Sequence, residues 1–442
     1  MTSGTERLLA APIIPTLARL SAPGILLVIF QSMVSVGDTF FVGRLGTAPL
    51  AALALVFPLI MLLQMTSAGA MGGGVSSAIA RALGAGNAAA ARRLVIHALV
   101  IAAGMAMLFT AAVLAFGRPL YALLGGSGET LAHALAYSNI VFAGAVTVWL
   151  ANTLSSVLRG SGNMHVPAFA LISAAVVHLP LSGGLVLGWG PLPQLGIAGA
   201  GIAYVTTFGI AALVMAAVVF RRGSALRPRA EDFRLEGPLF RDILRVGAVS
   251  MLSALQTVLT AVVLTGFVGR HGAAALAGYG VGLRLELLQI PLVFAVGQAM
   301  VVLVGTNLGA QRVERARHIA WVGTAFAACI SLAIGAGAAL FPAAWVGLFS
   351  SDAAVLETGS HYLRTVAPFY PFLAAGIALY FASQGAGRVV LPVLAGTARL
   401  AIVIIGGIAV ATLQGVFATI AVGMVVFGAL TMLFVKRTKW QP

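Results

Sequence analysis

Long apolar segments separated by short polar breaks run along the whole chain. Each segment has roughly 20 residues or more, enough to cross about 30 Å of hydrocarbon as a helix. The segments are continuously apolar rather than alternating, which favours helices over the strands of a β-barrel. The pattern predicts an all-α membrane protein with twelve transmembrane helices, near residues 21–42, 48–78, 94–116, 132–157, 167–189, 196–220, 244–268, 274–305, 319–341, 361–383, 390–411 and 414–435.

Three segments of the first half return in the second half, displaced by about 225 residues. The pairs are VGRLGTAPLA at Val42–Ala51 with VGRHGAAALA at Val268–Ala277, LGAGNAAAARR at Leu83–Arg93 with LGAQRVERARH at Leu308–His318, and GSGNMHVP at Gly160–Pro167 with GAGRVVLP at Gly385–Pro392. The nearly constant displacement indicates that whole halves are repeated. With six helices in each half, both halves start on the same side of the membrane. The repeats are then parallel, and a central cavity is expected between them near the midplane.

The longest polar stretch, Arg221–Arg245, separates the two halves and is rich in Arg. We interpret it as a linker. The predicted organisation is an N-terminal six-helix lobe at residues 1–220, a basic cytoplasmic linker at residues 221–245 and a C-terminal six-helix lobe at residues 246–442.

Composition strengthens the assignment to a membrane. Hydrophobic residues make up 60% of the chain and charged residues 8%, whereas soluble domains carry about 25% charged residues. The net charge of +15 lies in the short breaks between apolar segments, so nucleic acid is not an expected partner. If both termini are cytoplasmic, 21 of the 26 Lys and Arg fall in or beside cytoplasmic segments. This asymmetry predicts a multi-pass protein of the cell inner (plasma) membrane.

Four segments carry a resemblance to the multidrug and toxin extrusion (MATE) family of secondary transporters. They are VGDTFFVGRLGTAPLAAL at Val36–Leu53, GGGVSSAIARALGAGNAAAARR at Gly72–Arg93, LAGYGVGLRLELLQIP at Leu276–Pro291 and VGTNLGAQRVERAR at Val304–Arg317. The similarity extends from about Leu20 to Phe434. It implies a V-shaped bundle of twelve helices whose cavity opens to one side at a time. It also implies export of organic compounds, driven by the inward flow of protons or sodium ions.

Asp38 is the main candidate for ion coupling. It lies late in the first predicted span, one or two turns before Gly43. A carboxylate inside the membrane is costly unless it is hydrated, paired or protonated, and such acids are functional by default. The resemblance places the functional acid of the family's first helix at Asp38, within the pattern D-T-x-x-V-G. The alternative is a structural role, in which Asp38 pairs with Arg44 or caps neighbouring backbone.

The expected partners of Asp38 depart from the family pattern. Many members carry Asn and Asp four residues apart in the fifth span, where this chain has His178 and Ser182. A Thr of the sixth span is replaced by Tyr204. A sodium site prefers several hard oxygen ligands and added negative charge, so the missing acid favours protons. His178 could relay protons or be a hydrogen-bonded core histidine. The predicted cation or proton site comprises Asp38, His178, Ser182 and Tyr204. Neither a metal site nor a cofactor is expected besides H⁺ or Na⁺ as the coupling ion.

Glu286 is the other acid near a span, early in the eighth span. It could bind a cation in the second half, or it could pair with Arg284 or Arg270 at the membrane interface. The second reading is favoured because long charged side chains near helix ends can reach water. The seventh span, Val246–Leu264, holds no acid, so we do not expect a cation site in the second half.

Polar and adaptable side chains that interrupt the apolar spans are candidates for the cavity wall. Amides can hydrogen-bond varied ligands or join helices. Methionines adapt to ligand shape, and aromatic faces attract organic cations. For any single residue, joining helices, packing or anchoring at the membrane interface is the more frequent role. The predicted set is Gln31, Met61, Gln64, Met65, Trp149, Asn152, Thr206, Gln256, Glu286, Gln289 and Tyr370.

No enzyme motif is present in the sequence. HExxH, paired cysteines and a nucleophile elbow are absent, and no Gly-Lys-Ser/Thr follows the glycines at Gly72–Gly74. We predict a monomeric secondary antiporter, not an enzyme. It would export small organic compounds, cationic or amphipathic, from the lipid bilayer or cytoplasm in exchange for protons.

The alternatives share the membrane fold. They are a sodium-coupled drug exporter, a dedicated metabolite exporter and a non-transporting binding or sensor protein. A flippase for lipid precursors is less favoured, because it would need strongly basic residues inside the cavity, and the predicted spans contain almost none.

Overall fold

The computed structural model describes residues 3–438 and residue 440. The described chain is almost entirely helical. Its elements are α1 (Ser3–Ala10), α2 (Ile13–Gly43), α3 (Thr47–Gln64), the π-helix η1 (Met65–Met71), α4 (Gly72–Gly84), α5 (Ala88–Leu123), α6 (Gly128–Ala143), α7 (Ala145–Gly160), α8 (His165–Leu187), α9 (Ile197–Phe220), the 3₁₀ turn η2 (Ala230–Phe233), α10 (Gly237–Gly269), α11 (Ala273–Gly309), α12 (Val313–Leu340), α13 (Pro342–Val346), α14 (Ala353–Val366), the 3₁₀ turn η3 (Ala367–Phe369), α15 (Tyr370–Gly385), α16 (Val390–Ala409) and α17 (Leu413–Arg437).

The all-α membrane fold predicted from the apolar pattern is confirmed. In the described part of the chain, eleven helices are long and apolar enough to span a membrane, or twelve when the bent pair α6 and α7 counts as one span. The two members of that pair meet at an angle of 48°. Each predicted span falls on one helix or on helices that run on from one another. The second span is α3, η1 and α4, and the tenth is α14, η3 and α15.

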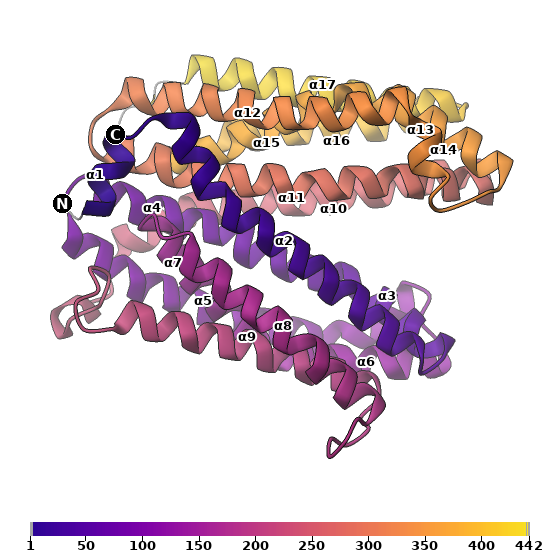
Figure 1. The fold of residues 1–442 in the computed structure, drawn as a ribbon, viewed down its shortest axis with the longest axis horizontal. Coiled ribbons are helices and arrows are strands. Elements are labelled where there is room, and N and C mark those ends of the chain that lie inside the picture. Colours follow the sequence, from indigo (N-terminus) through magenta and orange to yellow (C-terminus); the bar gives the residue numbers. More distant parts are fainter. Residues whose placement is uncertain (1–2, 439, 441–442) are drawn as a thin grey trace.

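The helices form two bundles arranged as a V. Figure 1 shows α2–α9 and α10–α17 adjoining at the end of the molecule where both termini lie, and diverging toward the opposite end. At the adjoining end α4 packs against α10, α11 and α15 of the other bundle. We call this the closed end and the opposite one the open end.

Glycines of the repeated segments let the bundles approach at the closed end. A Cβ atom at Gly84 would clash with the carbonyl oxygen of Thr306, and one at Gly309 would clash with that of Arg81. Gly84 belongs to LGAGN and Gly309 to its repeat, LGAQR. The same glycine of each repeat therefore packs on the other repeat, because small residues permit close approach of helix backbones.

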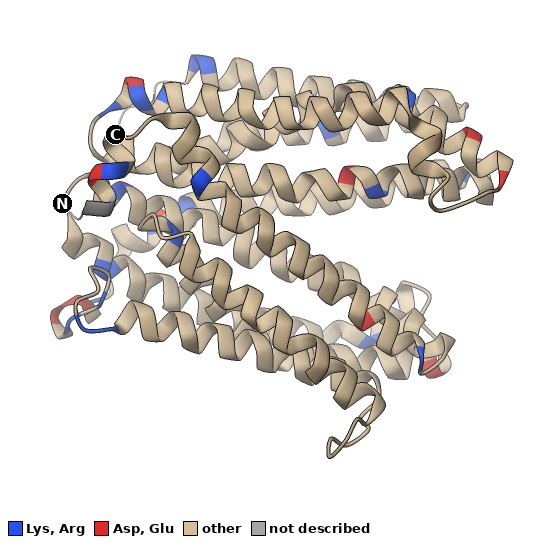
Figure 2. Ribbon diagram, viewed as in Figure 1, with Lys and Arg blue, Asp and Glu red and all other residues tan. Residues whose placement is uncertain are grey.

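Polar contacts join the bundles at the closed end. Arg81 Nη2 of α4 lies 2.7 Å from Asp242 Oδ1 of α10. Arg81 Nη1 also donates to the carbonyl oxygen of Gly385, at 3.1 Å. Arg245 Nη2 donates to the carbonyl oxygen of Gly387, also at 3.1 Å. Figure 2 shows that Lys and Arg gather mainly at this end.

The segment between the bundles folds against α5. Asp232 Oδ2 accepts a hydrogen bond from Arg92 Nε at 2.8 Å and one from the backbone of Arg229 at 2.9 Å. The backbone N–H of Glu236 donates to His97 Nε2 at 2.8 Å. Helix α10 begins at Gly237 and so within the predicted linker. Proline is tolerated in the first turn of a helix, so Pro238 is compatible with a helix that begins at Gly237.

Candidate functional site

A cavity of about 1120 Å³ lies between the two bundles. Its wall combines residues of α2, α3, α7, α8 and α9 with residues of α10, α11, α15 and α16. Most of these side chains are apolar, with a few polar groups at separate places. A space of this size and composition suits a small organic molecule.

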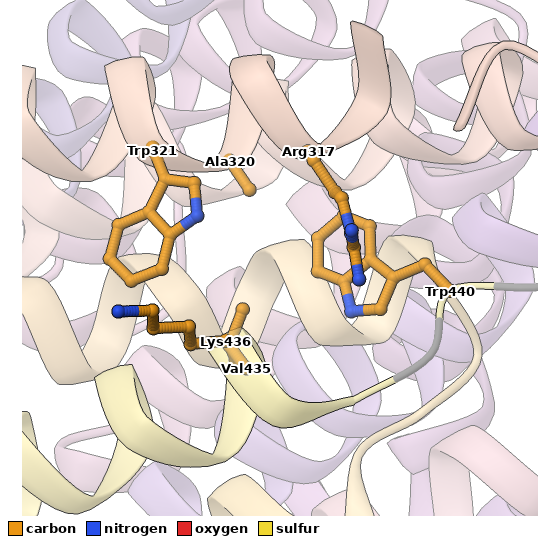
Figure 3. A pocket seen from close by; sticks show the side chains of 6 residues that line it. All are labelled: Arg317, Ala320, Trp321, Val435, Lys436 and Trp440. Carbon is orange, nitrogen blue, oxygen red and sulfur yellow. The ribbon is translucent and has the colours of Figure 1, made fainter. Parts of the chain in front are cut away.

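A second, much smaller hollow lies near the C-terminus, between α12 and α17. It has about 120 Å³ and is lined by Arg317, Ala320, Trp321, Val435, Lys436 and Trp440. Figure 3 shows Trp321 above Lys436 on one side, with Arg317 and Trp440 on the other. It has room for only a few waters, so the large cavity between the bundles is the candidate functional site.

The predicted acid, Asp38, lies buried on the cavity wall in contact with α8. His178 Nε2 is 3.0 Å from both Asp38 Oδ1 and Asp38 Oδ2. Ser182 Oγ donates to Asp38 Oδ1 at 2.5 Å. His178 and Ser182 are four residues apart on α8 and therefore share one helix face. The structure thus brings three of the four predicted ion-site residues together.

The close packing of α2 on α8 explains how Asp38 reaches its partners. A Cβ atom at Gly37 would clash with the side chain of Leu179. The absence of that atom lets the backbone of α2 approach α8 beside the acid. Asp38 does not pair with Arg44, the structural alternative, since the Arg44 guanidinium lies over the Phe40 ring, 4.8 Å from its centroid.

Thr207 completes the surroundings of His178, although the sequence analysis had selected its neighbour. Thr207 Oγ1 lies 3.3 Å from His178 Nδ1 and donates to the carbonyl oxygen of Ala203 at 2.8 Å. With its proton directed to that carbonyl, the hydroxyl can accept from Nδ1–H. Thr206 is exposed on α9 and does not line the cavity, whereas the adjacent Thr207 does. The predicted cavity residue is corrected accordingly.

The fourth predicted ion-site residue, Tyr204, joins a neighbouring chain of hydrogen bonds. Its hydroxyl accepts from Gln64 Nε2 at 2.6 Å. Gln64 Oε1 accepts from Asn152 Nδ2 at 3.0 Å, and Asn152 Nδ2 also donates to Ser67 Oγ at 2.8 Å. Ser67 belongs to the π-helix η1, a type of segment that is frequent at functional sites. The Tyr204 and His178 rings meet edge to face with centroids 6.5 Å apart, so the two groups are adjacent.

Six of the predicted cavity residues lie on the cavity wall. Gln256 is held in place there, because its Nε2 donates to Thr397 Oγ1 at 2.7 Å. The six are Gln31, Met61, Gln64, Met65, Asn152 and Gln256.

The other five predicted cavity residues lie elsewhere among the described residues. Trp149 and Tyr370 are fully buried within their own bundles, and Thr206 is exposed on α9. Glu286 and Gln289 of α11 are buried behind the cavity wall. A span that is apolar on every side does not reveal which face points to the cavity, and these five predictions fail for that reason.

Glu286 has a different partner from the two proposed from sequence. Arg399 Nη2 of α16 is 3.9 Å from Glu286 Oε1, and the Tyr362 hydroxyl donates to Glu286 Oε2 at 3.1 Å. Arg284 instead lies over the Phe349 ring, 5.1 Å from its centroid. The interface ion pair is therefore wrong, because α16 places a guanidinium nearer to the acid.

Two arginines on the cavity wall were not anticipated. Arg159 of α7 and Arg399 of α16 both line the cavity, one in each bundle. Arg159 lies two residues beyond the predicted end of the fourth span, and Arg399 lies within the eleventh. The sequence shows that both arginines are there, but it does not show which way their side chains point. Among the described residues there is no group of three or more His, Cys, Asp or Glu side chains able to hold a metal ion.

Comparison with known proteins gives consistent results. The chain matches the MatE family model over residues 23–182 and 249–409. It is 28% identical over 376 residues to the FAD transporter of Shewanella oneidensis, covering 85% of this chain and 82% of that protein. It is 24% identical over 391 residues to the probable multidrug resistance protein NorM of Thermotoga maritima, covering 86% and 81%.

Solved structures agree over nearly the whole chain. A MOP superfamily transporter from Pyrococcus furiosus, described as having a binding pocket of reverse polarity, superposes with a TM-score of 0.91 at 25% identity. The match covers 99% of this chain and 98% of that one. An outward-facing multidrug resistance MATE family transporter of the same superfamily superposes with a TM-score of 0.89 at 25% identity, again over 99% and 98%.

Proposed function

Because this chain belongs to the MATE family of membrane transporters, we propose that it is a proton-coupled antiporter. It exports amphipathic organic compounds by alternating access of the cavity between its bundles. Family membership makes it a transporter and not an enzyme. The coupling ion, the substrate class and the direction of transport are the parts that we propose.

The observation that carries the proposal is the cluster of Asp38, His178 and Ser182 on the cavity wall. One ring nitrogen of His178 is 3.0 Å from both carboxylate oxygens. With Thr207 placed to accept from the other ring nitrogen, the geometry suits an imidazolium paired with a carboxylate. Loss of one proton leaves a neutral imidazole that still donates to Asp38. The pair can therefore gain and lose a proton without losing its hydrogen bond.

This geometry favours protons over sodium. A sodium ion bound by Asp38 would need several oxygen ligands around the carboxylate. His178 nitrogen occupies the space beside both carboxylate oxygens, and one hydroxyl, that of Ser182, contacts Asp38. Sodium would have to displace the imidazole, whereas a proton would not.

We propose that the two lobes, residues 1–220 and 246–442, rock about the cavity as units. Both termini and most Lys and Arg lie at the closed end (Figure 2). The positive-inside rule makes that end cytoplasmic in the cell inner membrane. The conformation described here would then open outward. In the exchange cycle of a monomer, protonation of the Asp38 cluster from outside accompanies release of substrate.

A dedicated exporter of an anionic metabolite is the second candidate function. Arg159 and Arg399 on the cavity wall favour it, and a relative that covers most of the chain is an FAD transporter. The same arginines weaken the prediction of cationic substrates, because a guanidinium repels a cation.

Transport by reconstituted vesicles tests the coupling. Protein in vesicles with an imposed pH gradient should export a fluorescent amphipathic dye, and Asp38→Asn should reduce gradient-driven export at least tenfold. Glu129→Gln is the matched control, because Glu129 is an exposed acid in the first turn of α6. Export driven by a sodium gradient at constant pH, or undiminished pH-driven export by Asp38→Asn, would contradict the proposal.

A further inference from the structure

The closed end of the cavity contains an arginine without an acidic partner. Arg159 lies in the last turn of α7 and lines the cavity. Its Nη2 donates to Ser156 Oγ at 3.0 Å, and its Nε is buried without a hydrogen-bond partner. None of the ion pairs formed within residues 3–438 and 440 includes Arg159. A half-buried cation without a counter-ion is costly inside a membrane protein, so its presence calls for a function.

A polar stripe on α7 continues from Arg159 along the cavity. Asn152, Ser155, Ser156 and Arg159 follow the spacing of one helix face. Ser155 is 1% exposed and lines the cavity, yet its hydroxyl has no hydrogen-bond partner. Asn152 and Ser156, in contrast, are engaged with protein groups. Two unsatisfied groups, a guanidinium N–H and a hydroxyl, therefore lie one turn apart on the same wall.

The charges elsewhere on the wall do not neutralise Arg159. Asp38 lies in the penultimate turn of α2, toward the open end, where it is hydrogen-bonded to His178 and Ser182 of α8. Glu286 is buried behind the wall, 3.9 Å from Arg399. Arg399 has a buried Nε without a partner as well. The cavity wall thus has two arginines, Arg159 and Arg399, and one acid, Asp38. Arg159 is the arginine that has no acidic side chain beside it.

We propose that Arg159 and Ser155 form an anion-binding subsite at the closed end of the transport cavity. The substrates are then amphipathic organic anions, with a phosphate or carboxylate group on an apolar or aromatic body. The anionic group pairs with the part of the Arg159 guanidinium that faces the cavity. Arg159 Nε and Ser155 Oγ are covered in this conformation and donate to the anion once their side chains turn toward it, while the body occupies the apolar wall. This inference rests on the proposed transport function and names its substrate class in place of the cations predicted from sequence.

A binding experiment with two matched probes tests the subsite. Riboflavin 5′-phosphate and riboflavin share one fluorescent ring system and differ by a phosphate group. Purified full-length protein should bind the phosphate at least tenfold more tightly, because hydrogen bonds between charged groups are strong. Arg159→Gln should remove that preference while changing riboflavin affinity less than twofold. Arg159→Lys should restore part of the preference, and Ser155→Ala should reduce it about threefold.

Two controls separate the subsite from other effects. Arg222→Gln removes the same charge from an exposed position outside the cavity and should keep the full preference. Binding of the cationic dye rhodamine 6G, measured for every variant, reports whether the cavity remains folded. Competition by dihexanoyl phosphatidylglycerol but not by the phosphatidylcholine analogue would identify a lipid headgroup as the natural anion. Absence of competition by either lipid would identify a water-soluble one.

The binding results test the anion-binding subsite independently of the proposed proton-coupled transport. Equal affinity of the native protein for both flavins, or a preference that survives in Arg159→Gln, overturns the subsite. So does failure of the native protein to bind either flavin. A preference that depends on Arg159, in a protein that shows no proton-driven export, confirms the subsite and rejects the proposed antiport.

Discussion

His178 contacts both oxygens of Asp38 through one ring nitrogen, in a span where the family resemblance had implied a second acid. An imidazole can hold a positive charge beside the Asp38 carboxylate, whereas a second carboxylate would repel the Asp38 carboxylate. Histidine in place of the second acid therefore supports the proposal that the site takes up protons. The family resemblance located the position, and the contact with Asp38 supports the role proposed for it.

His178→Gln tests that role. Glutamine can still donate a hydrogen bond to Asp38, but it cannot take up a proton. We expect proton-driven export to fall roughly tenfold and to depend less on pH than export by the native protein, because the side chain that takes up a proton is lost. Initial rates of dye export measured at a series of pH values provide the test. A variant with the native pH profile would show that His178 only packs beside the acid.

At the scale of elements, the crossing of α4 and α11 depends on two glycines. A methyl group at Gly84 would meet the carbonyl oxygen of Thr306, and backbone atoms cannot rotate away as side chains can. We expect Gly84→Ala to cost about 1–3 kcal/mol through overpacking, seen as a lower midpoint of thermal unfolding. Gly104→Ala, on α5 with open space around it, is the matched control and should lose nothing. Equal midpoints for the two variants would contradict a close crossing.

The linker depends on Asp232 for its attachment to α5. Burial acts to raise the pKa of Asp232. The hydrogen bonds from Arg92 and the Arg229 backbone, with the charges of Arg92 and Arg93, outweigh burial and lower that pKa below its ordinary value of 3.8. A lowered pKa in the folded state stabilises the linker above about pH 3.8, and this contribution is lost as the pH falls through the lower, folded-state value.

Asp232→Asn should remove this contribution at neutral pH. We expect trypsin to cleave the arginine-rich linker roughly tenfold or more faster in the variant, since a hydrogen bond to a charged group contributes about 1.5–3 kcal/mol. Limited proteolysis followed by gel electrophoresis measures the rate. Asp352→Asn, at an exposed helix cap, should leave cleavage of the linker unchanged. Slower or equal cleavage in Asp232→Asn would contradict the attachment.

On the scale of the whole molecule, the closed end is held by contacts between the two bundles. Arg81 joins Asp242 and the carbonyl oxygen of Gly385, so one side chain of α4 contacts two helices of the other bundle. Asp242 is 44% exposed in its side chain, and an exposed pair contributes about 0.2–1 kcal/mol. Such a pair biases the equilibrium between two conformations without preventing either.

Asp242→Asn should therefore shift the population away from this conformation by roughly 1.4- to fivefold. Spin labels at Ala88 and Glu314, in a Cys329→Ala background, would report the distance between the bundles at the closed end. The charge exchange Arg81→Asp with Asp242→Arg should recover part of the native distribution. A distribution unchanged in Asp242→Asn would show that glycine packing alone closes this end.

The sequence by itself determined the membrane fold and the duplication, and it selected Asp38 as the candidate for ion coupling. The duplication rests on the repeated segments. The fold and the choice of Asp38 rest on costs that the membrane imposes on every face of a helix: a span must be apolar, and an acid inside it must be hydrated, paired or protonated. The repeated glycines of LGAGN and LGAQR were also visible, although their contact across the bundles was not.

Only the tertiary structure decided which way each side chain points. Thr206 and Thr207 are adjacent, but one is exposed on α9 and the other contacts His178. In a soluble helix the apolar face would reveal the direction, since the opposite face meets water. A membrane helix meets lipid on one side and its bundle on the other, and both are apolar. Arg159 on the cavity wall and Glu286 behind it could therefore be assigned only once the helices had packed.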